Sequence, residues 1–102
     1  MSGPERDDLF EAAQKAFSKP FGAVIRLEPE AGATLWVDGR AGKAVVTRSD
    51  PGENACVWRA SRETLIRIFE GERMLASSFV SGRLRVAGDM SVMTRLHMES
   101  GS

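Results

Sequence analysis

The chain has 102 residues, 42% of them hydrophobic, and its 14 basic and 14 acidic residues give a formal net charge of zero. These figures predict one domain over residues 1–102. They exclude a typical nucleic-acid binder, because phosphate contacts demand an excess of Lys and Arg.

The first residues predict an amphipathic helix within 1–20. Asp7 or Asp8 can cap it, Pro20 ends it, and one apolar stripe holds Leu9, Phe10, Ala13, Ala16 and Phe17. The acidic start differs from a secretion signal, and no apolar run approaches the about 18 residues that span a bilayer. The single cysteine, Cys56, permits no internal disulfide. We therefore expect a cytoplasmic protein whose membrane contact is at most transient.

A strand rhythm begins after Gly22, where Ala23, Ile25 and Leu27 alternate with Val24, Arg26 and Glu28. Further strands are predicted over residues 34–38, 43–47 and 55–60. The turns between them are rich in Gly, Asp and Pro, which suit tight backbone reversals. Four strands at this short spacing predict an antiparallel meander.

The next region predicts two helices. Ser61 can cap the first and Gly71 can stop it. Its buried face is expected to hold Leu65, Ile68 and Phe69. In the second helix, over residues 73–80, the side chains of Leu75 and Phe79 are expected to face the interior.

Residues 81–97 predict a strand over 83–86, then a glycine, Gly88, and a helix start at Asp89. The two faces of this strand carry Leu84 and Val86 on one side and Arg83 and Arg85 on the other. After Asp89 a helical rhythm places apolar residues at Met90, Val92, Met93 and Leu96. Together the elements predict an α+β fold, with a five-stranded, mostly antiparallel sheet covered on one face by helices.

A motif of the form Gly-basic-Leu-basic-x-x-Gly-Asp-Met runs unbroken from Gly82 to Met90. With this motif, the chain resembles the sterol carrier protein 2 (SCP2) family of lipid-binding domains, and the resemblance covers residues 21–98. The resemblance implies an apolar cavity between sheet and helices and non-enzymatic binding or transfer of lipids. Its expected ligand is a fatty acid, a fatty acyl-CoA or a sterol-like lipid.

Predicted inward positions supply the candidate lining of that cavity. The candidates are Trp58, Leu65, Ile68, Phe69, Leu75, Phe79, Met90, Met93 and Leu96. Met74, Met90, Met93 and Met98 gather towards the end of the chain, and methionine suits surfaces that fit several apolar shapes. The same periodicity also describes an ordinary filled core. In that alternative, the chain is a protein-interaction or accessory module that docks on a lipid-metabolising enzyme.

Catalytic and metal chemistry finds little support in the pattern. His97 is the only histidine and is predicted to be solvated, while Cys56 alternates with Trp58 on the inner face, as an inert thiol would. No metal-ligand spacing and no Gly-x-Ser-x-Gly motif occurs. Gly88 before a helix start resembles a phosphate cradle, but the Asp89 carboxylate opposes an anion there. We expect no catalytic residue, no metal and no cofactor.

Two surface features leave alternatives open. Arg83, Arg85 and Arg95 suit anionic head groups or a partner, or form a solvated face. Trp36 alternates with Leu35 and Val37, and an exposed tryptophan often marks an interface. The sequence permits a homodimer through the uncovered sheet face and equally permits packing of Trp36 under the first helix.

Overall fold

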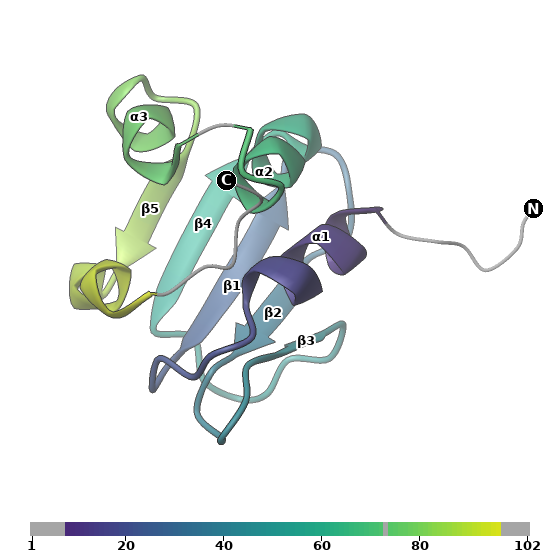
Figure 1. Cartoon of the computed structure of the whole chain (residues 1–102), viewed down its shortest axis with the longest axis vertical. Coiled ribbons are helices and arrows are strands. Elements are labelled where there is room, and N and C mark those ends of the chain that lie inside the picture. Colours follow the sequence, from purple (N-terminus) through teal and green to yellow (C-terminus); the bar gives the residue numbers. More distant parts are fainter. Residues whose placement is uncertain (1–7, 73, 97–102) are drawn as a thin grey trace, which may run out of the picture.

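The sheet in the computed structural model, which describes residues 8–72 and 74–96, has five strands in the order β3-β2-β1-β4-β5. The strands are β1 (Val24–Pro29), β2 (Leu35–Asp38), β3 (Val45–Thr47), β4 (Cys56–Ala60) and β5 (Arg85–Gly88). Across one face lie α1 (Asp8–Ala16) and α2 (Arg62–Phe69), whereas α3 (Leu75–Val80) and the 3₁₀ helix η1 (Met90–Arg95) flank the two ends of β5 (Figure 1). The predicted α+β fold with a mostly antiparallel sheet is confirmed.

The position of β4 corrects the predicted meander. β1, β2 and β3 do form one, with antiparallel pairing at both steps. The chain then returns past β1, and β4 pairs with its far edge in parallel, aligning Ile25 with Cys56 and Leu27 with Trp58. The short connection after β3 suggested a hairpin, but a turn signal does not say which strand edge is free. Pairing with β1 puts the apolar faces of both strands on the same side.

The covered face of the sheet holds the core. Along β1 and β4 the residues that point towards the helices are 2% exposed or less: Ile25, Leu27, Cys56, Trp58 and Ala60. The helical layer above them contributes Leu9, Ala13, Ala16, Phe17, Leu65, Ile68 and Phe69. Period-2 strands and period-3.6 helices thus meet along matching apolar surfaces.

The ends of α2 follow the predicted signals. The Ser61 hydroxyl oxygen accepts a hydrogen bond from the backbone N–H of Thr64 at 3.1 Å. Gly71 adopts a left-handed φ of 82°, which glycine allows at little cost. By contrast, α1 ends at Ala16, before the predicted stop at Pro20. Phe17 continues its last turn by donating from its N–H to the carbonyl of Ala13 at 2.9 Å.

β5 lies two residues later than predicted, over Arg85–Gly88 instead of 83–86. An even shift leaves each side chain on its face, so Leu84 and Val86 still point to the core side and Arg83 and Arg85 remain exposed. Gly88 belongs at the strand end because it has a φ of 93°, and a Cβ there would lie 2.5 Å from the carbonyl oxygen of Ala55. This glycine therefore lets β5 approach β4 closely.

The last element is a 3₁₀ helix where an α-helical rhythm was predicted. Asp89 does cap it, and its carboxylate accepts from the Ser91 N–H at 2.9 Å. The backbone then closes from Val92 N–H to the Asp89 carbonyl at 3.2 Å, a three-residue spacing. A helix with three residues per turn does not bring the apolar residues of an α-helical pattern onto one face. Of the residues in η1, only Val92 is fully buried.

Candidate functional site

The deepest candidate residues come together around Trp58. Trp58 on β4 and Leu65, Ile68 and Phe69 on α2 are all 2% exposed or less. The Trp58 ring stacks near Phe69 with centroids 6.2 Å apart, and Phe17 approaches it at 6.1 Å. Phe17 also meets Phe69 edge-on at 5.4 Å. We call Phe17, Trp58 and Phe69 the aromatic cluster; it lies in the layer between sheet and helices.

Among the described residues, the indole N–H of Trp58 is buried and has no oxygen or nitrogen as a hydrogen-bond partner. Its polar neighbour on the same strand face is the Cys56 thiol, a weak acceptor at best. Burial raises the pKa of that thiol, an effect that its interaction with Trp58 only partly opposes. The thiol therefore stays protonated at neutral pH and is a poor nucleophile. The layer between sheet and helices thus contains an N–H donor whose neighbour is at best a weak acceptor.

The other candidates lie at the edge of the sheet next to β5. Leu75, Met93 and Leu96 are partly buried and pack against the core. Phe79 and Met90, which were predicted to point inward, are 43% and 44% exposed. Met74 and Val80, on either end of α3, are more exposed still. We call Phe79, Val80, Met74 and Met90 the apolar edge residues.

The orientation of α3 explains the exposure of Phe79. This six-residue helix turns Ser78 into the protein, 1% exposed, instead of Phe79. The Ser78 hydroxyl donates to the Met74 carbonyl at 2.9 Å, and the Ser78 carbonyl accepts from the Leu84 N–H at 3.0 Å. The small side chain of Ser78 lets α3 pack close to the segment that leads into β5. Phe79, the next residue, then points towards solvent.

The described residues hold no group of three or more His, Cys, Asp and Glu side chains that could bind a metal ion. Two carboxyl groups have a lowered pKa, and both make structural contacts. Hydrogen bonds from Arg40 lower the pKa of Asp38, and hydrogen bonds from Ser91 lower that of Asp89. His97 and Met98 lie outside the described residues.

The opposite face of the sheet, which we call the open face, carries polar and charged side chains. Trp36 lies there, half-buried, and its indole N–H donates to the Asn54 side-chain oxygen at 2.9 Å. Since its neighbours Leu35 and Val37 are buried under the helices, Trp36 does not pack beneath α1. None of the helices described is long and apolar enough to cross a membrane.

Residues 7–98 match the model of the SCP-2 sterol transfer family. The chain is similar to sterol carrier protein 2 from Yarrowia lipolytica in its apo form, with 20% identity and a TM-score of 0.60 over 84% of this chain and 75% of that one. It is also similar to the UbiJ-SCP2 ubiquinone synthesis protein, with 22% identity and a TM-score of 0.61 over 89% and 76% of the two chains.

A third similar structure is the inverting sec-alkylsulfatase Pisa1 from Pseudomonas sp., with 15% identity and a TM-score of 0.57. That match covers 92% of this chain but 15% of the sulfatase, so the fold also occurs as one part of an enzyme. No curated protein matches the sequence. At these identities the structural likeness establishes the fold.

Proposed function

This chain belongs to the SCP-2 sterol transfer family, and we propose that it binds one lipid molecule between its sheet and its helices without catalysing a reaction. The proposed ligand is a fatty acid, a fatty acyl-CoA or a sterol-like lipid. The family membership supports lipid binding or transfer in general. The observation that carries the finer proposal is that, within the part of the chain that the structure describes, the apolar layer contains a buried donor without an oxygen or nitrogen acceptor, the indole N–H of Trp58.

The proposed site has a fixed wall and a movable edge. The wall comprises Trp58, Leu65, Ile68 and Phe69. The movable edge comprises Leu75, Met93 and Leu96, together with Phe79 and Met90 from the apolar edge residues. α1 packs on α2 and β3, whereas α3 and η1 make only sparse contacts with other elements. The N-terminus of α3 also lacks a side-chain cap. Elements held this loosely open at low cost, which supports ligand entry at this edge.

Burial provides the affinity in this proposal. Each methylene moved from water into the apolar layer contributes about 0.8 kcal/mol, so ten would contribute about 8 kcal/mol before the cost of ordering the chain. Before that cost is subtracted, the sum corresponds to a dissociation constant of about 1 μM, and longer chains would offset the cost. A ligand carbonyl or carboxylate oxygen would accept from Trp58, relieving a buried donor whose isolation costs about 1–3 kcal/mol. Selectivity for chain type would be broad, because apolar contact is non-directional.

A second candidate is an accessory module that docks on a lipid-metabolising enzyme. The aromatic cluster supports it, since Phe17, Trp58 and Phe69 fill much of the layer that a lipid would occupy. The apolar edge residues would then contact the enzyme instead of a lipid. In both candidates we propose a cytoplasmic location, with which the free thiol of Cys56 is compatible.

The deciding experiment measures uptake of a fluorescent fatty acid by the purified protein, after organic extraction and mass spectrometry of any lipid that co-purifies. We expect stoichiometric uptake. Phe79→Asp should weaken uptake at least tenfold. Val45→Asp is the matched control, because Val45 is similarly exposed, at 47% against 43%, but lies on the distant strand β3.

Failure of the folded protein to take up the fatty acid would overturn lipid binding and favour the accessory module. Uptake that Phe79→Asp leaves intact would reject the proposed entry edge while keeping the lipid function. The folded state of each variant is checked by circular dichroism.

A further inference from the structure

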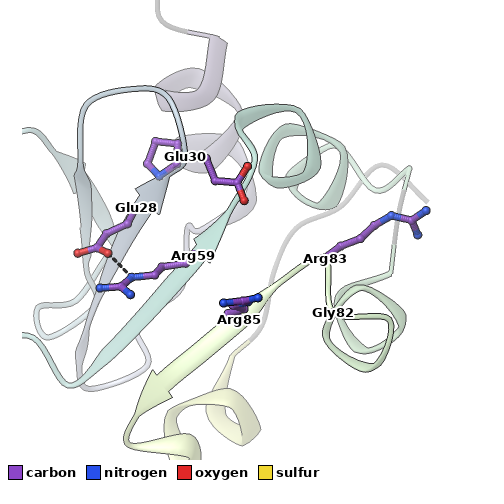
Figure 2. A pocket seen from close by; sticks show the side chains of 7 residues that line it. Glu28, Glu30, Arg59, Gly82, Arg83 and Arg85 are labelled. Carbon is purple, nitrogen blue, oxygen red and sulfur yellow. Dashed lines mark hydrogen bonds and ion pairs between the residues drawn. The ribbon is translucent and has the colours of Figure 1, made fainter.

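The open face of the sheet carries a polar pocket that the proposed lipid function does not use. Two adjoining hollows of about 370 and 380 Å³ share Glu28, Arg59 and Arg85 in their walls. One hollow extends towards Glu30 and Arg83, as Figure 2 shows, and the other extends towards Arg26. Both lie on the side of the sheet away from α1 and α2, so they are separate from the apolar layer.

The strand register places two arginines opposite each other in this pocket. In the antiparallel pair of β4 and β5, Arg59 stands directly opposite Arg85. Side chains in such positions are about 4.5–5.5 Å apart at their Cβ atoms, and like charges there destabilise the sheet. Glu28 offsets the charge of Arg59, and a bound anion would also offset that of Arg85.

Of the two glutamates that line the pocket, Glu28 is already engaged by arginines. Oε1 of Glu28 pairs with Nε of Arg59 at 2.5 Å, and Oε2 pairs with Nε of Arg26 at 2.7 Å. Among the described residues, Arg85 and Arg83 have no ion-pair partner. Both arginines are exposed, so their guanidinium groups are available to a ligand.

The pocket is positive although the chain as a whole is neutral. Its two hollows are lined by four arginines, at positions 26, 59, 83 and 85, against the two glutamates Glu28 and Glu30. Arginine offers a planar fork of N–H donors that matches the oxygens of phosphate. An oxyanion between two such forks would receive hydrogen bonds from both sides.

We infer that the pocket on the open face binds a phosphate-class oxyanion between the guanidinium groups of Arg59 and Arg85. The same chemistry occurs in a soluble phosphorylated molecule and in the head group of an anionic phospholipid. Salt weakens such binding, because the arginines are exposed and their charges are screened. The site does not depend on the apolar layer, so it stands whether or not the protein binds lipid there.

The test is a titration with inorganic phosphate at constant ionic strength, followed by the arginine Nε–H signals in NMR spectra. We expect saturable shifts confined to Arg59, Arg85 and their neighbours. Arg85→Gln should weaken the affinity at least tenfold. Arg67→Gln is the charge-matched control, because Arg67 pairs with Glu63 on α2, away from the pocket. Removing the like-charge pair should leave Arg85→Gln at least as heat-stable as the parent.

Co-sedimentation with vesicles then identifies the source of the phosphate. Binding to phosphatidylglycerol but not phosphatidylcholine vesicles, lost in Arg85→Gln, supports the site with a lipid head group as its ligand. Saturable phosphate binding without vesicle association supports it with a soluble ligand. Phosphate shifts spread over all arginines, or an affinity unchanged in Arg85→Gln, would overturn the inference whatever the vesicles show.

Discussion

The two ends of the helical layer differ in how firmly they are held. Over β1 and β4, α1 and α2 bury most of their apolar side chains and pack around the aromatic cluster. Beside β5, α3 and η1 each contain one fully buried residue, Ser78 and Val92, and leave Phe79 and Met90 largely exposed. The helical layer is thus tightly packed at one end and loosely packed at the other. Substitutions at the tight end should lower the free energy of unfolding more than substitutions at the loose end.

Trp58→Ala tests the firm end and should have the largest effect. Truncating a fully buried aromatic residue costs about 3–5 kcal/mol, a large share of the about 5–15 kcal/mol that stabilises a typical domain. Phe79→Ala, at the loose end, should cost far less because Phe79 is 43% exposed. Chemical denaturation measures both free energies of unfolding. Equal losses of unfolding free energy in the two variants would show that the two ends of the helical layer are packed equally tightly.

Trp58→Phe sharpens this result. It keeps an aromatic ring and removes the unpaired N–H, so its cost should be well below that of Trp58→Ala. A loss as large as that of Trp58→Ala would mean that the indole N–H has a partner in the folded protein.

Gly88→Ala tests the strand end that leads into η1 and should have the next largest effect. Alanine must adopt the positive φ of 93° and also place its Cβ 2.5 Å from the Ala55 carbonyl oxygen. Gly82→Ala is the control, since its φ of 85° is similar but no atom lies within 4 Å. A left-handed alanine costs about 1–2 kcal/mol. Denaturation should show a clearly larger loss for Gly88→Ala; equal losses would argue against close packing of β5 on β4.

The pH dependence of the η1 cap should give the smallest effect. Hydrogen bonds from Ser91 hold the pKa of Asp89 below its usual range. A carboxyl group with a lower pKa in the folded state stabilises the fold above its unfolded pKa, and this contribution disappears as pH falls through the folded value. NMR titration of the Asp89 side chain should thus show a midpoint below that of an ordinary aspartate. Asp89→Asn should remove this pH dependence, and a normal midpoint would contradict the cap.

Local signals in the sequence predicted the elements with clear chemistry. Ser61 and Gly71 bound α2 because a cap hydroxyl and a left-handed glycine act on their own neighbours. The faces of β5 were also predictable, since alternation survives a shift of two residues. These features depend on spacing over a few residues.

Features that depend on distant partners could not be predicted from the sequence. Nothing within the residues of β4 indicates that it pairs with β1 in parallel instead of with β3. Two apolar residues in a helix as short as α3 do not determine which face turns inward, and Ser78 occupies the buried position. The like-charge pair of Arg59 and Arg85 became visible only with the strand register.

The parallel pairing at the centre of the sheet has a consequence for how the chain folds. Glu28 and Arg59, neighbours across β1 and β4, are 31 residues apart in the sequence. Contacts over such separations close large loops and slow folding relative to hairpin formation. The hairpins formed by β1, β2 and β3 can form early. The outer edge of β1 stays unpaired until β4 reaches it. We therefore expect the rate of folding to be set by the meeting of these two central strands.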